Sequence, residues 1–431
     1  MLQKLPIAND IDACFIHKVD GGFSPKKFKE MGELGSIALE FIRARFDDGS
    51  LPILTLPYRR DDIASWKPIV DRYHSLYKDV VVLGIGGSIL GGATVCALVD
   101  GSLITSPRIH FLDNIDPITF DSRLSSFDMD KTGFLAISKS GSTTETLTKL
   151  LIVIDRLGNK NFSKQITCLT EPTDNPMRRI ASTYGFFCLE YDPKVIGRFS
   201  ALSTAGLLPA AIAGLNVERV RHGAAAVLDA TISAKNPLEN PAVAGAAINV
   251  ALARNHGINQ TVLMPYVERL ERLSIWFRQL WAESLGKEGH GTTPVNALGA
   301  VDQHSQMQLY LAGPKDKFFT VICSDPRGLG GRVRAELAGS AAESLNYLVG
   351  HTMGDLMAAE QRATIDCLIR NSCPTRLISF SNLNEEVMGG LIMQFILETI
   401  AAAQIMGINA FDQPVVEENK LLIRQFLQEE T

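Results

Sequence analysis

The sequence lacks the features of several broad protein classes. It contains no block of Lys and Arg and has a net charge of −5, so neither nucleic acid nor an anionic membrane is an expected partner. The most apolar central stretch, residues 201–215, contains Pro209 and several small residues and falls short of a membrane-spanning helix. The opening residues, MLQKLPIAND, have no apolar core and no cleavage site, so we expect no signal peptide.

Cysteine is sparse and unpatterned. The seven cysteines are odd in number and scattered, and no two are arranged as CxxC. This pattern suggests neither a disulfide framework nor a zinc site. We therefore expect mostly buried thiols in a cytoplasmic protein that binds no metal.

The residues that are present are typical of a soluble globular enzyme. Apolar residues make up 46% of the 431 positions and charged residues 21%. Because this length exceeds the usual size of one core, we expect two domains of roughly 150–200 residues each.

Short apolar runs alternate with longer amphipathic runs along the chain. Strands separated by helices in this way are typical of an α/β fold with a doubly wound parallel sheet. The strands predicted are 79–84, 108–113, 133–137, 165–169 and 186–189, followed by a second series at 260–264, 317–322 and 375–380. We predict a helical N-terminal segment (1–45), a first α/β domain (46–215), a second α/β domain (216–410) and a C-terminal loop and helix (411–431).

The most informative local pattern is FLAISKSGSTTET at residues 134–146. Its apolar part predicts a buried strand and Glu145 opens a helical run, so residues 138–144 form a polar loop at a helix N-terminus. Such a loop offers backbone N–H groups, hydroxyls and the Lys139 ammonium to an anion. These donors suit a terminal phosphomonoester. An ordinary Ser/Thr-rich helix cap is the structural alternative.

A glycine-rich loop, GIGGS at residues 84–88, also follows a predicted strand. Glycines let the backbone approach a ligand closely. The spacing of Gly84, Gly86 and Gly91 misses the GxGxxG dinucleotide fingerprint, although Asp113 could imitate the acid that binds the ribose. A sugar-contacting loop fits better than a dehydrogenase site.

A predicted helix at 267–285 carries polar residues at regular spacing. Gln279, Glu283 and Lys287 are four residues apart and therefore lie on one face. Large apolar residues crowd the same helix: Trp276, Phe277, Leu280 and Trp281. We expect them to desolvate the Glu283 carboxylate partly, which would make it a stronger base. The alternative is a solvated face with a Glu–Lys pair worth only about 0.2–0.5 kcal/mol.

Two residues near the C-terminal half are further candidates. His304 lies in a glycine-led segment with polar neighbours, although a lone His is more often structural. Lys420 falls on the first turn of the last predicted helix (416–428), where an ordinary surface charge is the alternative.

Taken together, these motifs resemble the glucose-6-phosphate isomerase family, in its shorter bacterial type. Six segments occur in the family's order: GIGGS (84–88), SKSGSTTET (138–146), GRFS (197–200), QLWAESLGK (279–287), DQHS (302–305) and DQPVVEENK (412–420). The resemblance implies two tandem sugar-isomerase (SIS) domains, each a doubly wound parallel sheet flanked by helices, closed by a C-terminal helical segment. It also implies interconversion of glucose 6-phosphate and fructose 6-phosphate in glycolysis and gluconeogenesis, through a cis-enediol and without a cofactor or metal.

The resemblance assigns roles residue by residue. Glu283 matches the base that shuttles a proton between C2 and C1, and Arg198 matches the arginine that stabilises the enediolate charge. His304 and Lys420 match residues that assist ring opening. In the family that histidine comes from the partner subunit, so a homodimer is implied. The residues implied to bind substrate are Gly87, Ser88, Ser138, Lys139, Ser140, Ser142, Thr143 and Gln279.

Two departures from the family pattern affect the last segment. Val415 and Asn419 stand where the family usually has glycine. A β-branched residue adopts a positive φ with difficulty, so the loop that carries Lys420 could run differently.

Two rival functions share these motifs. A sugar-phosphate-binding regulator would usually add a DNA-binding module, and no basic helix-turn-helix precedes residue 45. The other rival is an isomerase of the same group, acting on mannose 6-phosphate or on aminosugar phosphates. The aminosugar type usually accompanies a glutaminase domain with an N-terminal cysteine, and Cys14 is not terminal.

Overall fold

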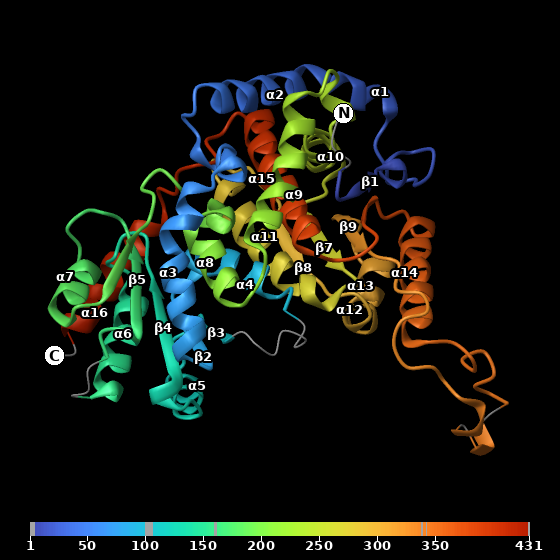
Figure 1. Ribbon diagram of the computed structural model, residues 1–431. Helices are drawn as coiled ribbons and strands as arrows, with labels where there is room; N and C mark the ends of the chain where they lie inside the picture. The colour runs from blue at the N-terminus through green and yellow to red at the C-terminus, as the bar shows by residue number, and fades with distance from the viewer. Residues whose placement is uncertain (1–4, 100–106, 159–161, 338, 342, 430–431) are drawn as a thin grey trace.

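The computed structural model describes residues 5–99, 107–158, 162–337, 339–341 and 343–429. Two five-stranded sheets are flanked by helices, several of which lie between the sheets (Figure 1). The predicted α/β class is confirmed. Residues 1–4 and 430–431 of the predicted terminal segments lie outside the described residues.

The first sheet has the strand order β3-β2-β4-β5-β6, and its neighbouring strands are parallel. Its strands are β2 (Asp79–Leu83), β3 (Arg108–Leu112), β4 (Thr132–Ile137), β5 (Ile166–Thr170) and β6 (Phe187–Glu190). Val80 and Val82 join the central core, whereas Val81 and Leu83 pack on the outer face. The helices on that face are α5 (Pro117–Ser125), α6 (Thr144–Leu157) and α7 (Pro176–Tyr184). Burial on both faces explains the unbroken apolar run of β2.

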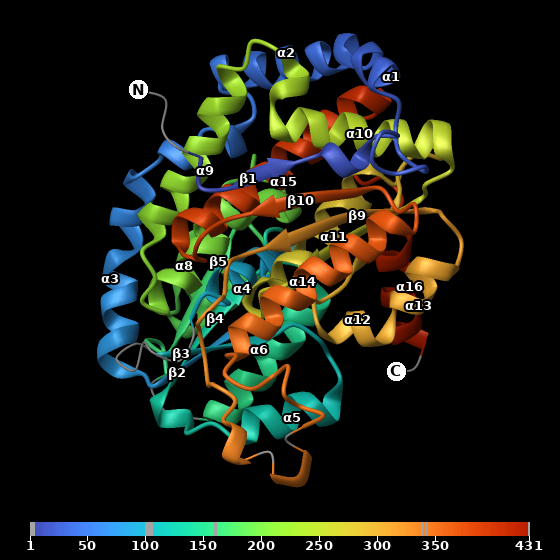
Figure 2. The same cartoon turned by 90° about the vertical axis from the view of Figure 1, so that its right-hand side faces the viewer.

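The second sheet has the order β1-β10-β9-β7-β8. Four strands are parallel: β7 (Gln260–Pro265), β8 (Thr293–Asn296), β9 (Lys317–Cys323) and β10 (Thr375–Ser379). β1 (Ala8–Asp10) pairs antiparallel with β10, beside which it lies in Figure 2. The strands β1 and β8 were not predicted, because both are short and neither contains an apolar run.

A group of central helices joins the two sheets. α15 (Glu385–Met406) packs against α2 (Gly32–Asp47), α9 (Val217–Ile232), α10 (Pro241–His256) and α11 (Glu271–Leu285). One hydrophobic core contains side chains from these helices and from both sheets. α15 is long and apolar enough to cross a membrane, but 94% of its apolar window is buried, so it is the core helix of a soluble fold.

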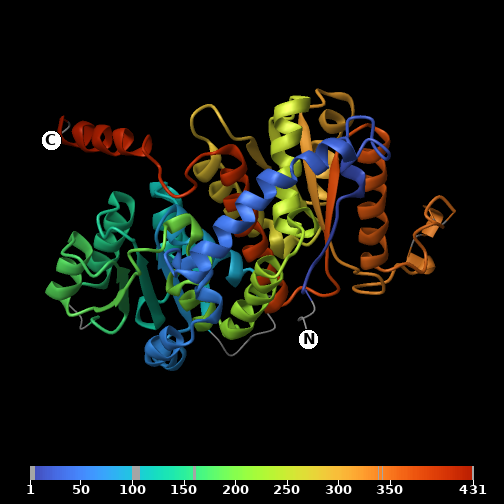
Figure 3. The same ribbon diagram turned by 90° about the horizontal axis from the view of Figure 1, so that it is seen from above.

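The remaining helices surround this core. They are α1 (Pro25–Glu30), α3 (Asp61–Leu76), α4 (Leu90–Cys96), α8 (Thr204–Ile212), α12 (Val301–Ser305), α13 (Met307–Ala312), α14 (Met353–Arg370) and α16 (Val416–Glu429). Figure 3 shows α16 extending beyond the body of the molecule, with residues 326–337 and 343–352 projecting at the opposite end.

Two predicted helices are interrupted. The predicted helix at 267–285 begins with a 3₁₀ turn, Glu268–Leu270, before α11. The stretch 201–215 begins inside a 3₁₀ helix, Gly197–Leu202, which is followed by α8. Ser203 separates the latter two, because its Oγ accepts a hydrogen bond from the Ala205 N–H and caps α8.

Candidate active site

A cleft of about 680 Å³ lies at the carboxyl end of the first sheet. Ligands of open α/β sheets bind outside this end of the strands. Most predicted site residues line the cleft: Gly87, Ser88, Lys139, Ser140, Ser142, Thr143, Arg198, Gln279, Glu283 and Lys420. Two predicted site residues, Ser138 and His304, are not among the described residues that line it.

The loop after β4 is built around buried contacts. Ser138 is fully buried, and its Oγ lies 2.8 Å from Thr143 Oγ1. Thr143 is the N-cap residue of α6, yet its side chain makes no capping hydrogen bond. The ordinary-cap alternative is therefore wrong for this residue, because its hydroxyl does not bond the first-turn N–H groups of α6.

Gly141 sets the shape of this loop. Its φ is +63°, and a Cβ at this position would lie 1.9 Å from Asn175 Oδ1. Only glycine fits both requirements.

Lys139 shares the cleft with an acidic residue that the sequence did not reveal. Its Nζ lies 3.6 Å from Glu171 Oε1, and both residues line the cleft. Glu171 follows β5, and no local pattern distinguishes it from any other residue after a strand. An incoming anion would have to compete with Glu171 for this ammonium.

Arg198 is fixed by contacts from distant parts of the chain. Its Nε donates to Ser284 Oγ at 2.8 Å, and its Nη2 donates to the carbonyls of Ala410 and Asp412. Its Nη1 donates to Gln413 Oε1 at 2.7 Å and lies 3.3 Å from Glu283 Oε1. Burial lowers the pKa of Arg198 below its usual value, and the carboxylates of Glu283 and Asp412 oppose this. The Nη1 group therefore presents a fixed positive charge beside Glu283.

Glu283 and Gln279 project from α11 into the same cleft. The Glu283 side chain is 25% exposed, whereas the four apolar residues singled out on this helix are all buried in the core. Gln279 Oε1 is buried and has no hydrogen-bond partner within the described part of the chain. A sugar hydroxyl is the kind of donor that would satisfy this oxygen.

Lys287 does not form the surface pair with Glu283 that the alternative interpretation required. Its Nζ donates to Asp412 Oδ1 at 2.6 Å and to the backbone carbonyls of Asn409 and Asp412. This contact lowers the pKa of the Asp412 carboxyl. Lys287 and Arg198 together hold residues 409–413, and this places Gln413 in the lining of the cleft. Gln413 was not predicted as a site residue, since the sequence showed it only within the motif 412–420.

The two proposed ring-opening residues differ in position. Lys420 lines the cleft from α16, together with Asn419 and Arg424. Val415 is not among the described non-glycine residues with positive φ, which are Glu288, Ala300 and Ser372, so valine does not strain this loop. His304 is exposed on α12 and lies outside the cleft of its own chain.

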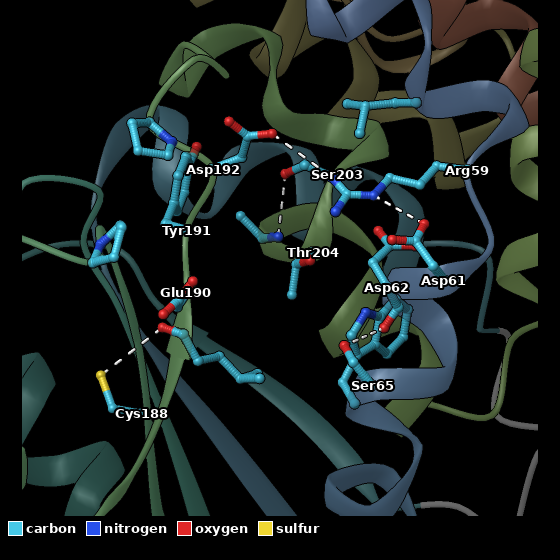
Figure 4. A pocket seen from close by; sticks show the side chains of 16 residues that line it. Arg59, Asp61, Asp62, Ser65, Cys188, Glu190, Tyr191, Asp192, Ser203 and Thr204 are labelled. Carbon is cyan, nitrogen blue, oxygen red and sulfur yellow. Dashed lines mark hydrogen bonds and ion pairs between the residues drawn. The ribbon is translucent and has the colours of Figure 1, made fainter.

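A second cavity, of about 490 Å³, lies between β6 and α3 (Figure 4). Its charged lining is mostly acidic: Asp61, Asp62, Glu190 and Asp192, with Arg59 paired to Asp61 and Asp192. Two further arginines contact these carboxylates. Arg221 pairs with Asp62 and Arg178 pairs with Glu190, so neither guanidinium is left to bind an anion in this cavity. This lining disfavours a phosphate, and the first cleft is the better candidate for a sugar phosphate.

This chain is similar to known proteins in both sequence and fold. The sequence model of the family described as phosphoglucose isomerase matches residues 64–431. A glucose-6-phosphate isomerase of Rubrobacter xylanophilus is 35% identical over 421 residues, which cover 94% of each chain. The solved structure of a hypothetical protein from Thermus thermophilus has a TM-score of 0.85 at 29% identity, covering 98% of this chain and 99% of that one. A glucose-6-phosphate isomerase structure from Chlamydia trachomatis has the same fold, with a TM-score of 0.81 at 18% identity, covering 99% and 89% of the two chains.

Proposed function

The chain belongs to the phosphoglucose isomerase family, and we propose that the cleft at the carboxyl end of its first sheet carries out the family's reaction. The chain is an aldose–ketose isomerase that interconverts glucose 6-phosphate and fructose 6-phosphate in glycolysis and gluconeogenesis. We further propose that it acts in the cytoplasm. The roles of individual residues follow from the geometry of the cleft.

The substrate's phosphate binds at the start of α6. Lys139, Ser140, Ser142 and Thr143 line the cleft together with the first residues of α6, and their ammonium, hydroxyl and N–H groups are the donors that bind the phosphate. Ser138 acts indirectly, because its Oγ holds the Thr143 hydroxyl. Charge-assisted hydrogen bonds of this kind contribute about 1.5–3 kcal/mol each. Gly87 and Ser88 line the sugar part of the cleft, opposite Gln279.

Glu283 moves the proton. It removes a proton from C2 of the open-chain aldose, or from C1 of the ketose, and returns it to the neighbouring carbon. The electron pair left behind forms a cis-enediolate whose oxygen carries negative charge, and a hydroxyl proton passes between O2 and O1 before the carbon is protonated again. Arg198 stabilises that charge through Nη1, which lies beside Glu283 and also donates to Gln413, whereas Nε and Nη2 are held by Ser284 and by backbone carbonyls. The 3.3 Å separation of Glu283 and Arg198 is the single observation that carries this assignment.

Ring opening uses Lys420 and His304, and the histidine is supplied by a second copy of the chain. His304 lies outside its own cleft, which supports a partner-derived role. Two described parts of the projecting segment, residues 326–337 and 343–352, expose large apolar side chains, which are typical of an interface. They are Leu329, Val333, Leu337 and Tyr347.

The first experiment compares wild type with Glu283→Gln in a coupled assay, with fructose 6-phosphate as substrate and a glucose-6-phosphate dehydrogenase reporter. We expect wild type to turn over without added metal and the variant to lose about 10²–10⁴-fold in kcat, because the base is removed without changing its shape. If neither protein turns over but both bind the sugar phosphate, the chain is a sensor and not an isomerase.

Mixing two inactive variants tests the shared site. Glu283→Gln and His304→Ala dimers, combined and allowed to exchange subunits, form mixed dimers. In such a dimer one site contains both intact residues if His304 crosses to the partner. Recovery of activity with ring substrate supports the proposal. No recovery in a sample shown to contain mixed dimers would contradict it.

A further inference from the structure

Lys149 lies where an apolar residue is expected. It belongs to the buried face of α6, together with Leu150, Val153, Ile154 and Leu157, and only 1% of its surface is exposed. Burying a charged side chain costs free energy unless the charge is well solvated by protein groups. Simple packing of α6 against the sheet would be achieved better by leucine or methionine. The lysine therefore requires a separate explanation.

The ammonium joins the ends of two parallel strands. Lys149 Nζ donates to the carbonyl of Gly84 at 2.7 Å and to the carbonyl of Leu112 at 2.8 Å. Leu112 ends β3, and Gly84 follows β2 and is the first residue of the glycine-rich loop 84–88. These carbonyls are strand-end groups, and the lysine supplies a donor to each of them.

The same contact connects the two walls of the cleft. One wall is the loop 84–88, which presents Gly87 and Ser88. The other wall is the phosphate loop, which leads directly into α6, the helix that carries Lys149. Gly87 also packs against residue 197, since a Cβ on Gly87 would lie 2.5 Å from the Gly197 carbonyl carbon. A shift of the loop would therefore reach both the sugar site and the turn that carries Arg198.

We propose that Lys149 is a positioning residue for substrate binding, whose buried ammonium fixes the loop 84–88 against the helix that binds the phosphate. The proposal rests on the function proposed above and adds a residue that contacts no substrate. It predicts a larger effect on KM than on kcat, since Arg198 is also held by Ser284 and by the carbonyls of residues 410 and 412, which lie outside that loop.

The environment of Lys149 makes this contact sensitive to pH. Burial lowers the pKa of Lys149 to about 8, and the carboxylates of Asp113 and Glu145 oppose this shift. Asp113 follows β3 and pairs with Arg272 of α11, and Glu145 lies one turn earlier on α6. Loss of the proton weakens the charge-assisted bonds to Gly84 and Leu112. We therefore expect kcat/KM to fall as the pH rises through about 8, with a smaller change in kcat.

The test is the pH profile of wild type and three variants between about pH 6.5 and about pH 9.5, a range in which the substrate's phosphate, with a second pKa of about 6, is largely ionised. Lys149→Met should raise KM at neutral pH by about tenfold, the equivalent of one charge-assisted hydrogen bond, and should remove the alkaline fall in kcat/KM. Lys149→Arg, which stays charged, should keep KM low and also remove the fall. Lys67→Met, on the exposed side of α3, is the matched control and should match wild type.

The outcomes are distinguishable. A merely structural role would lower the melting temperature and the active fraction of Lys149→Met while KM and the alkaline fall stayed as in wild type, and that result would overturn the proposal. If Lys149→Met does not fold, an alkaline fall that persists in Lys149→Arg also overturns it, because Lys139 or Lys420 would then be its source. An inactive wild type would contradict the isomerase function itself.

Discussion

The helices α6 and α14 both follow the central strand of a sheet and both have threonine at the N-cap, yet their N-termini differ in chemistry. Thr352 and Asp355 of α14 form a complete capping box, and Asp355 also accepts from the Gly328 N–H. These backbone bonds lower the pKa of Asp355. On α6, Thr143 makes no cap bond. The end of α14 is thus closed by its own carboxylate, whereas the end of α6 has no side-chain cap and is where we propose that the substrate's phosphate binds.

The loops before these two helices also differ, in how closely the basic residue of each loop is paired with a carboxylate. Arg327, near the end of the second sheet, is paired with Asp325 through two of its nitrogens. Lys139, in the loop after β4 of the first sheet, lines the cleft, and its Nζ lies 3.6 Å from Glu171 Oε1. In the function proposed above, one architecture gives a phosphate site where the helix N–H groups are not capped internally and the nearby cation is held only at 3.6 Å. We propose that the first sheet binds the substrate and that α11 and the turn before α8 supply the catalytic residues.

If the first sheet binds substrate and α11 with the turn before α8 supplies catalysis, Arg198→Lys should have the largest effect on activity. A lysine cannot reproduce the fork that contacts Ser284, Gln413 and Glu283 together. We expect kcat to fall by about 10²–10³-fold, as for the loss of an oxyanion donor, with a smaller change in KM. Steady-state kinetics with fructose 6-phosphate measures both. A rise in KM alone would show that Arg198 binds substrate without stabilising the enediolate.

His304→Ala should have the next largest effect, and only with ring substrates. We expect about 10²-fold slower turnover of cyclic glucose 6-phosphate, since an acid–base group for the ring oxygen is lost. A four-carbon aldose 4-phosphate cannot close to a ring and should be isomerised at the wild-type rate. Equal slowing of both substrates would exclude a specific role in ring opening.

A matched pair of threonine variants tests the two helices directly. Thr143→Val should raise KM for fructose 6-phosphate by about tenfold, and any loss of stability should come from the broken contact with the buried Ser138 hydroxyl, because Thr143 makes no cap bond. Thr352→Val should leave KM unchanged and lower the free energy of unfolding by about 1 kcal/mol, the usual value of an N-cap. Urea denaturation and kinetics on both proteins decide this, and the opposite pattern would reverse the assignment of the anion site.

The smallest predicted effect is a loss of stability at high pH, which comes from buried cysteine thiols near both sheets. Burial raises the pKa of Cys14, beside the second sheet, to about 12, and it also raises the pKa of Cys168, in the first sheet. Because the unfolded thiols ionise near pH 9, the folded state loses stability as the pH rises from about 9 toward 12, by about 1 kcal/mol per buried thiol at pH 10. Urea denaturation at pH 8 and pH 10 measures the loss, which Cys168→Ala should reduce.

The sequence alone determined the local parts of this protein. The alternation of short apolar strands with longer helices predicted the α/β class, and the pattern around residues 138–146 predicted the strand, loop and helix start found there, because strand burial and helix starts depend on near neighbours. The binding of phosphate by this loop stays a proposal. The spacing of Gln279 and Glu283 likewise placed both on one face of α11, as the cleft requires.

Only the tertiary structure decided which of these groups remain available for chemistry. Arg198 is held by residues 410–413, which lie more than two hundred positions later in the chain. Lys149 donates to the carbonyl of Gly84, which lies 65 positions earlier. The strand β1 joins the second sheet although it lies at the other end of the chain. His304 has a promising sequence context but lies outside its own cleft. Burial and pairing of polar groups depend on contacts between distant segments, and no local pattern in the sequence specifies them.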